Sequence, residues 1–218
     1  MSLPFAWSFT TLKNFESCPF KFYSVKVAKR WVETYGDQQS WGNIVHDAFQ
    51  KRINAGSPLP PEVRYLEPVA SKIAALPGEK YPEFKFAVDD AFQPTKWSGA
   101  WSRGAADLWI VNGPTGALLD YKTGKRRPDE QLNLYAGYAF AHWPDVTKIH
   151  TNFVWLKDKK IDKDVIEREQ IGPVWQAFTQ RVHTLEEAYA KDKWPKRPSG
   201  LCRGWCPVKD CEFWEEKK

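Results

Sequence analysis

GAADLWIVNGPTGALLDYKTG, residues 104–124, is the stretch that decides the fold. It contains two short apolar runs, Asp107 to Val111 and Ala117 to Lys122, which are separated by the turn-forming sequence NGPTG. Each run is typical of a β-strand, so the stretch predicts a β-hairpin. Each predicted strand carries an acid, and a lysine follows two residues after the second acid.

The charged residues of the second strand, Asp120 and Lys122, share one face because successive side chains on a strand point to opposite faces. Hairpin pairing would bring Asp107 toward them. Two neighbouring carboxylates repel unless a cation lies between them, and their oxygens suit Mg²⁺ or Mn²⁺. A lysine beside them can stabilise developing negative charge or orient a water, which is what metal-assisted phosphodiester hydrolysis requires. The alternative is a solvent-facing pair, Asp120 and Lys122, on an edge strand.

The length and composition are those of a soluble globular protein. The chain has 218 residues with 42% hydrophobic and 27% charged residues, which predicts one domain, 1–218, with a substantial core. No apolar run approaches the length of a membrane span, and the N-terminus lacks the pattern of a secretory signal. We therefore expect a cytoplasmic protein without a membrane partner.

Basic residues crowd the end of the hairpin. The net charge is +5, and Lys125, Arg126 and Arg127 follow directly after Gly124. Basic side chains beside a carboxylate site suit a polyanion, because they bind phosphates while the acids hold a metal. Exposed members of the 12 Trp residues can stack on unpaired bases. The alternative is an ordinary solvated surface, since net charge alone is weak evidence.

The rest of the chain predicts helices around a small sheet. Alternation predicts further strands over 81–88, 149–157 and 161–170, with 89–103 as a loop or a continuation. Apolar spacing predicts helices over 8–30 with an interruption at Pro19, 40–53, 62–76, 129–143 starting near Pro128, and 173–192. This order predicts an α/β fold with a small mixed β-sheet flanked by helices. The predicted parts are a helical part, 8–53, that carries Cys18 and His46, a core, 81–192, and a cysteine-rich C-terminal part, 193–218.

Four cysteines suggest a second metal site. Cys202, Cys206 and Cys211 lie together in the tail, and Cys18 lies far away near the N-terminus. Without signs of export, disulfides are the less expected use. Four thiolates suit either a zinc ion or an iron–sulfur cluster, and the ligands alone do not decide which. Unrelated free thiols are the remaining alternative.

Several fragments occur in an order that resembles the PD-(D/E)xK nuclease superfamily and specifically its RecB-like branch. The fragments are SFTTLKNFESCPFKFY, GNIVH, GAADLW, DYKTG and QLNLY. The cysteines resemble those of the iron–sulfur members of that branch, which include the CRISPR adaptation nuclease, helicase–nuclease subunits and phage exonucleases. The resemblance spans nearly the whole chain and implies a restriction-endonuclease-like core whose N- and C-terminal segments are tied by a four-cysteine metal site.

The resemblance also implies roles for individual residues. Asp107, Asp120 and Lys122 would be catalytic. The Mg²⁺ or Mn²⁺ ligands would be His46, Asp107, Asp120 and the carbonyl of Tyr121. Glu83 fits the pattern loosely and would have a minor supporting role. The residues placed against DNA would be Gln131, Tyr135, Lys125, Arg126 and Arg127.

For the four-cysteine site, a structural [4Fe–4S] cluster is the expected cofactor. Its ligands would be Cys18, Cys202, Cys206 and Cys211. The spacing of the last three cysteines departs slightly from the usual pattern of the family, although the total span is unchanged. The type of cluster, and zinc in its place, therefore stay open.

The expected function is that of a metal-dependent DNA exonuclease that acts mainly on single-stranded DNA or DNA ends. The resemblance implies a setting in recombination, repair or phage DNA metabolism, with a recombination, annealing or helicase protein as a possible partner. The alternative is a catalytically weak DNA-binding subunit of a recombination or CRISPR adaptation complex. The complete set of ligands and the lysine argue against that alternative.

Overall fold

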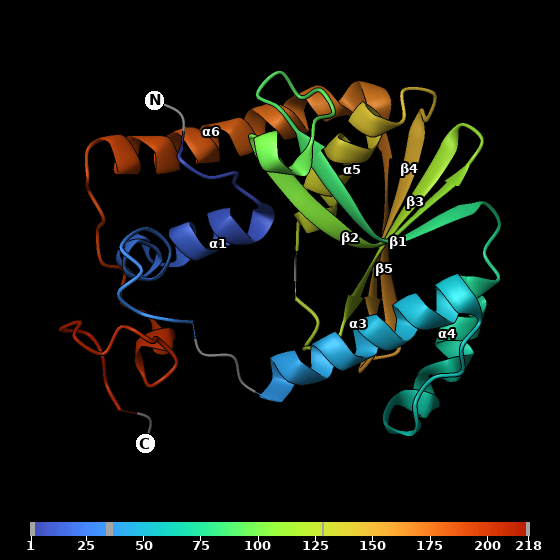
Figure 1. The fold of residues 1–218 in the computed structure, drawn as a ribbon, viewed down its shortest axis with the longest axis horizontal. Helices are drawn as coiled ribbons and strands as arrows, with labels where there is room; N and C mark the ends of the chain where they lie inside the picture. Colours follow the sequence, from blue (N-terminus) through green and yellow to red (C-terminus); the bar gives the residue numbers. More distant parts are fainter. Residues whose placement is uncertain (1–2, 34–36, 128, 217–218) are drawn as a thin grey trace. The chain divides into compact units, whose positions relative to one another are not determined.

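The computed structural model describes residues 3–33, 37–127 and 129–216. The chain forms two compact units, which we call the terminal unit, Met1–Tyr35 with Ala177–Lys218, and the sheet unit, Gly36–Gln176. Figure 1 shows the elements of both units. The sequence-based division of the chain into three parts stays a prediction.

The sheet unit is built on a five-stranded sheet in the order β1-β2-β3-β4-β5 (Figure 1). The strands are β1 Glu79–Val88, β2 Ser102–Asn112, β3 Thr115–Lys122, β4 Lys148–Trp155 and β5 Lys160–Glu167. β3 and β4 pair in parallel, and the other neighbours pair antiparallel. Parallel neighbours need a crossover connection, which α5, Gln131–His142, supplies. The predicted hairpin and the predicted small mixed sheet are confirmed.

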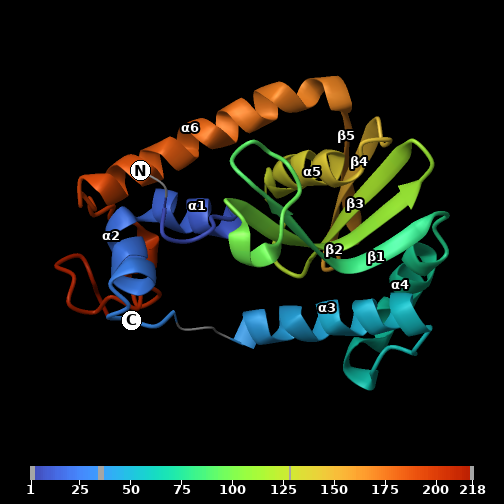
Figure 2. The same cartoon turned by 45° about the horizontal axis from the view of Figure 1, so that its top comes forward.

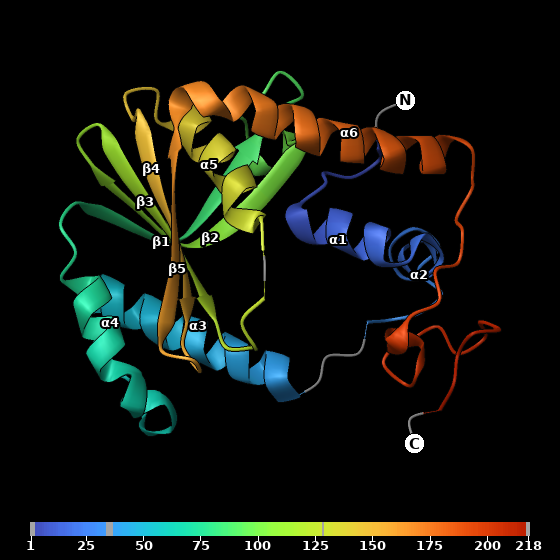
Figure 3. The ribbon, with the colours of Figure 1, turned by 180° about the vertical axis from the view of Figure 1, so that it is seen from behind.

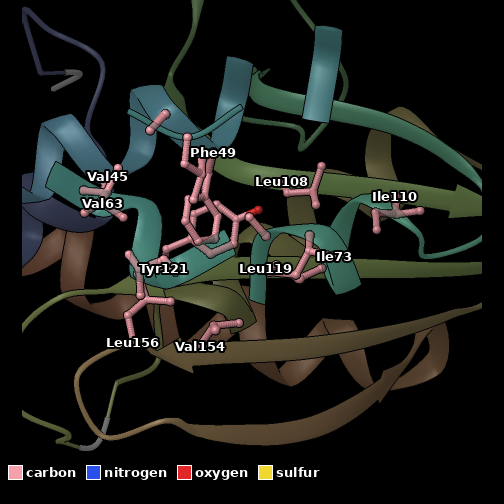
Figure 4. Packing of buried hydrophobic residues seen from close by; sticks show 14 residues of the cluster. Val45, Phe49, Val63, Ile73, Leu108, Ile110, Leu119, Tyr121, Val154 and Leu156 are labelled. Carbon is pink, nitrogen blue, oxygen red and sulfur yellow. The ribbon is translucent and has the colours of Figure 1, made fainter. Parts of the chain in front are cut away.

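Helices cover both faces of this sheet. α3, Asp37–Ala55, and α4, Glu67–Ala74, lie on one face, and α5 lies on the other (Figures 2 and 3). Beneath α3 and α4, apolar side chains of the two helices interlock with those of β2 and β3 (Figure 4). This cluster includes Val45, Phe49, Leu108, Ile110, Leu119 and Tyr121. Burial of this apolar surface fixes α3 along the strands that carry the predicted acids.

On the α5 face, the core is aromatic. Trp109 is fully buried, and its ring lies 5.4 Å from that of Trp143 and 6.5 Å from that of Phe86. Gly116 on β3 leaves room for this indole, because a Cβ at Gly116 would lie 2.0 Å from Trp109 Cη2. The absence of a side chain at Gly116 is therefore required by packing.

We expect Gly116→Ala to destabilise the protein by about 1–3 kcal/mol, because the added methyl group overpacks a closed core. The midpoint of urea unfolding, followed by circular dichroism, measures the effect. Gly172→Ala is the matched control, because a Cβ at Gly172 meets no atom within 4 Å. Equal midpoints for the two variants would contradict the packing argument.

The terminal unit contains α1, Phe9–Ser17, and α2, Pro19–Phe22, followed by a π-helical turn, Tyr23–Val27. The predicted interruption at Pro19 is confirmed: Cys18 is extended, with φ −160°, and caps α2 through its sulfur. Proline suits the first helical position because it has no N–H to leave unpaired there. The unit also includes Ala177–Ala190 of α6, Ile171–Ala190.

Several predicted boundaries were wrong. The range 89–103, predicted as a loop or a continuation, includes the start of β2 at Ser102, which pairs with Val88 of β1. The end of 161–170 is a 3₁₀ turn, Arg168–Gln170, and the start of 62–76 belongs to another, Pro61–Leu66. α5 begins at Gln131, and the predicted start at Pro128 lies outside the described residues. Among the described helices, none has the length and apolar character needed to cross a membrane.

Candidate metal and active site

Three potential metal ligands from α3, β1 and β2 converge in the sheet unit. His46, Glu83 and Asp107 each offer a ligand atom, and these atoms all lie within 4.8 Å of one another. All three residues are half-buried. Within the described parts of the chain, this is the group of three or more His, Cys, Asp or Glu side chains that is compact enough for one metal ion. Its nitrogen and carboxylate donors suit a divalent cation such as Mn²⁺ or Mg²⁺.

His46 is held at both ring nitrogens. Its Nδ1 lies 3.2 Å from Asp107 Oδ1, and its Nε2 lies 2.9 Å from the carbonyl oxygen of Tyr121, which accepts a hydrogen bond from it. Burial lowers the pKa of His46, but the hydrogen bond and negative charge of Asp107 outweigh it and raise the pKa to about 9. Without a metal, the ring is therefore held protonated between a carboxylate and a carbonyl, and it must lose a proton before one of its nitrogens can bind a cation.

Glu83 owes its position to an unusual backbone. It has φ 53°, a left-handed conformation that is rare for a residue with a side chain inside a strand. The register of β1 and β2 leaves Glu83 opposite Asp107. The pairs on either side of them are Pro82 with Leu108 and Phe84 with Ala106. Burial, and then the charge of Asp107, raise the pKa of Glu83.

The sequence analysis gave Glu83 only a minor role because the backbone conformation that places it in the site cannot be seen in the sequence. Alternation in YPEFKFAV predicts a strand, but it does not reveal a left-handed residue within it. The one signal available was an acid in the middle of a largely apolar strand. Strained backbone of this kind concentrates at functional sites.

Asp120 lies beside this cluster and is buried, with 5% of its surface exposed. Lys122 Nζ lies 2.9 Å from its Oδ2, so the ammonium and the carboxylate form a close ion pair. Burial first, and then the charge of Asp107, raise the pKa of Asp120 to about 7, although Lys122 opposes the shift. Because β3 is an interior strand, the alternative of a solvent-facing edge pair is wrong. A carboxylate whose pKa is raised by burial and by a second carboxylate fits a cation that binds close by.

Lys122 is held by several groups at once. Besides Asp120, its Nζ lies 3.5 Å from Asp129 Oδ2, donates to Gln131 Oε1 at 3.0 Å, and lies 5.3 Å from the centre of the Phe153 ring. Burial lowers the pKa of Lys122, but the charge of Asp120 outweighs it, so the net shift is upward. The side chain is therefore a charged ammonium in a fixed position.

Sequence reasoning missed Asp129. Its second carboxylate oxygen, Oδ1, accepts a hydrogen bond from the backbone N–H of Gln131 at 3.0 Å, at the start of α5. An acid at the start of a predicted helix was the available signal. The same carboxylate reaches Lys122, which the sequence did not indicate.

Gln131 and Tyr135, predicted to face DNA, form a hydrogen-bonded pair behind the lysine. Gln131 Nε2 donates to the Tyr135 hydroxyl at 3.0 Å, so that its Oε1 faces Lys122. Tyr135 is only 6% exposed. Gly104 makes room for it, since a Cβ there would lie 2.7 Å from Tyr135 Cε1. The structure thus places both residues next to the lysine, and their contact with DNA stays a prediction.

The predicted phosphate-binding residues after β3 are not equivalent. Arg126 forms a bidentate ion pair with Asp162 on β5, with Nε 2.9 Å from both carboxylate oxygens. Trp155 Nε1 also donates to Asp162, at 2.7 Å. Lys125 and Arg127 are exposed in the loop that leads to α5. The charge of Arg126 is therefore largely neutralised. For Lys125 and Arg127, phosphate binding stays a prediction.

The four cysteines line one pocket of the terminal unit. Burial raises the pKa of Cys206, while the Val208 N–H and the charge of Lys21 oppose the shift. The described cysteines form no disulfide, and their sulfurs are not as closely grouped as the ligands around His46. The pocket lies where the resemblance predicted a metal site, and its occupation by a metal stays a proposal.

Comparisons with known proteins include one family match and two solved structures to which the chain is similar. A family model described as the PD-(D/E)XK nuclease superfamily matches residues 6–108, and a search of curated proteins gives no match. The crystal structure of SSO0001 aligns over 99% of this chain and 90% of its own, with 13% identity and a TM-score of 0.49. That of a candidate exonuclease from Eubacterium rectale aligns over 88% of this chain and 84% of its own, with 12% identity and a TM-score of 0.52. The family match, which covers slightly less than half of the chain, supports the PD-(D/E)XK nuclease superfamily, and the second structure shows a similar fold.

Proposed function

We propose, from this support for a nuclease superfamily, that the chain is a metal-dependent DNA exonuclease of the RecB-like branch that hydrolyses phosphodiester bonds in single-stranded DNA or at DNA ends. The observation that carries the proposal is the convergence of His46, Glu83 and Asp107 within 4.8 Å, next to the Asp120–Lys122 ion pair. A cytoplasmic setting in recombination, repair or phage DNA metabolism, with a protein partner from those processes, belongs to the proposal through the resemblance alone.

The first role in hydrolysis is to bind the metal ion. His46, Glu83, Asp107 and Asp120 would hold Mg²⁺ or Mn²⁺ together with the carbonyl of Tyr121. A divalent cation bound there supplies a Lewis acid for the phosphate and lowers the pKa of an attacking water.

Lys122 acts as a fixed positive charge. Its ammonium group would stabilise the negative charge that develops on the phosphate, as preorganised donors do in other active sites. Asp129 and Gln131 hold it in place, so little reorganisation is needed during the reaction. Lys125 and Arg127 would bind the flanking phosphates without reading the base sequence.

A digest of end-labelled DNA tests this function. Single-stranded and blunt duplex oligonucleotides, labelled at the 5′ or the 3′ end, are incubated with Mg²⁺ or Mn²⁺ or with EDTA. We expect stepwise shortening of single strands with either metal and none with EDTA. The label that is released first gives the polarity of cleavage.

Covalently closed duplex DNA is the matched substrate control, because it has no end for an exonuclease. Its cleavage at the rate of the open substrates would replace the exonuclease proposal with an endonuclease. Metal-independent binding of labelled DNA without cleavage under any of these conditions would favour the DNA-binding subunit instead.

We also propose that Cys18, Cys202, Cys206 and Cys211 hold a structural [4Fe–4S] cluster, with Zn²⁺ as the alternative. The support is that all four cysteines line one pocket, although they are far apart in sequence. The choice of the cluster over zinc comes from the resemblance to the iron–sulfur members of the RecB-like branch.

Anaerobically purified protein is therefore expected to be brown and to contain iron and acid-labile sulfide. Cys206→Ala should lose most of the iron and lower the melting temperature, because metal binding to such a site is linked to folding. Cys206→Ser is the matched variant of similar size. Colourless wild-type protein with stoichiometric zinc would replace the cluster with a zinc site, and metal-free wild-type protein would contradict both.

A further inference from the structure

A polar groove lies next to the catalytic lysine in the sheet unit. It has a volume of about 610 Å³ and is lined by side chains from β4, β5, the start of α5 and the loop before it. Volumes of roughly 300–1,000 Å³ are typical of pockets for small ligands. The lining of the groove includes Asp129, Asn133, Phe153 and Asp162.

The groove begins at Lys122. Two of its lining residues, Asp129 and Phe153, are also contacts of the Lys122 ammonium, at 3.5 Å from a carboxylate oxygen and 5.3 Å from the ring centre. On the sheet, Phe153 of β4 pairs with Asp162 of β5, so the floor continues from the lysine toward the edge of the sheet. A group bound in the groove would therefore lie beside a phosphate held at Lys122.

The charges of the groove largely cancel. The carboxylate of Asp162 is paired with Arg126, and that of Asp129 lies against Lys122. What remains is a mixed lining of acidic and basic groups together with an aromatic ring and an amide, that of Asn133. A groove with as many acidic as basic lining groups is a poor site for a chain of phosphates, which needs clustered positive charge; this leaves Arg127, which also lines it, for a flanking phosphate. The groove suits a nucleoside, whose base has an apolar face and a hydrogen-bonding edge.

We propose that the groove holds one unpaired nucleotide adjacent to the scissile phosphate, with its base against Phe153 and its edge toward Asn133. This inference rests on the proposed nuclease function, because it takes Lys122 to mark the position of the phosphate. A base can reach an aromatic side chain in this way only when it is not stacked in a duplex. The groove thus gives the site a preference for single-stranded substrate.

Steady-state kinetics of Phe153→Leu and Asn133→Ala test the groove. The substrates are a single-stranded oligonucleotide and bis(4-nitrophenyl) phosphate, a phosphodiester without a nucleoside. Loss of base stacking predicts that Phe153→Leu raises KM for the oligonucleotide about tenfold. Asn133→Ala, which leaves the ring beside Lys122 intact, is expected to raise KM in the same direction. Val165→Ala, at an exposed β5 position outside the groove, is the matched control.

The effect of each variant on the oligonucleotide, compared with its effect on the small diester, distinguishes a role in binding the base from a role in positioning Lys122. A rise in KM for the oligonucleotide that exceeds any change in hydrolysis of the small diester supports the groove. Equal losses on both substrates, or no change on either, would overturn it.

If wild-type protein hydrolyses neither substrate, the proposed nuclease function is wrong, but this result does not decide whether the groove binds a nucleotide. Fluorescence anisotropy with a labelled single strand in EDTA then tests the groove separately. Weaker binding by Phe153→Leu and Asn133→Ala, but not by Val165→Ala, supports the groove. Equal binding by all four proteins refutes it.

Discussion

Asp107→Asn is expected to lower metal-dependent cleavage of single-stranded DNA by about 10³-fold or more, because a metal ligand contributes several kcal/mol to transition-state stabilisation. Asp107 is the hub of the site: Oδ1 lies 3.2 Å from His46 Nδ1, and Oδ2 accepts the backbone N–H of Tyr121 at 2.6 Å. An asparagine carbonyl can still accept from Tyr121, so the fold should persist. The loss is measured as kcat/KM with Mn²⁺.

Two comparisons make the result specific to the site. Asp47→Asn removes an exposed carboxylate from the residue after His46, where it pairs with Lys51, and should cleave at the wild-type rate. DNA binding by Asp107→Asn in EDTA should be unchanged or slightly tighter, because a negative charge is lost. Retention of full cleavage in a preparation free of other nucleases would remove Asp107 from the proposed ligands.

Asp120→Asn is expected to stabilise the metal-free protein at pH 8. The pKa of Asp120 is raised to about 7 by burial and by Asp107. A raised pKa means that the stability contribution is fully present below the unfolded-state value, ~3.9, and is lost as the pH rises through about 7. At pH 8 the wild-type carboxylate is ionised at a cost of a few kcal/mol, whereas the amide is neutral.

Thermal unfolding in EDTA between pH 5 and pH 8 measures this difference. The variant should melt several degrees above wild type at pH 8, and the gap should shrink toward pH 5. Saturating Mn²⁺ should reduce or reverse the difference in melting temperature between the variant and wild type. The reason is that a ligand that binds only the folded wild type stabilises it by mass action. A variant that melts below wild type at pH 8 in EDTA would contradict the prediction that the ionised Asp120 destabilises the metal-free protein.

Asp162→Asn provides the opposite case. The hydrogen bond from Arg126 lowers the pKa of Asp162, so its contribution is present above the unfolded-state value and is lost as the pH falls. The variant should therefore melt below wild type at pH 8, and the two should converge in acid. The two aspartates thus give variants with opposite effects under one condition.

The predictability of the site differs from residue to residue. Asp107, Asp120 and Lys122 could be singled out because strand alternation and a hairpin are local rules, and the structure brings all three to the interior of the sheet. His46 needed the resemblance, since a lone helical histidine carries no signal of its own. The contact of its ring with Tyr121 joins residues 75 positions apart.

Other features were beyond local rules. The left-handed backbone at Glu83 places it opposite Asp107, and nothing in an alternating strand reports such a conformation. The ion pair that neutralises Arg126 depends on where β5 returns to the sheet. A basic residue looks the same in sequence whether it faces phosphate or an acid of its own chain.

The sequence by itself determined the hairpin, the α/β class and the acids and lysine at its centre, because side-chain periodicity and turn chemistry act over a few residues. Tertiary structure alone decided that Asp120 is buried, that Lys122 is fixed by Asp129 and Gln131, and that Glu83 joins His46 and Asp107. The physical reason is that burial and electrostatic pairing depend on neighbours from distant parts of the chain. Those neighbours, rather than the residue types alone, set the charge of each group at the site.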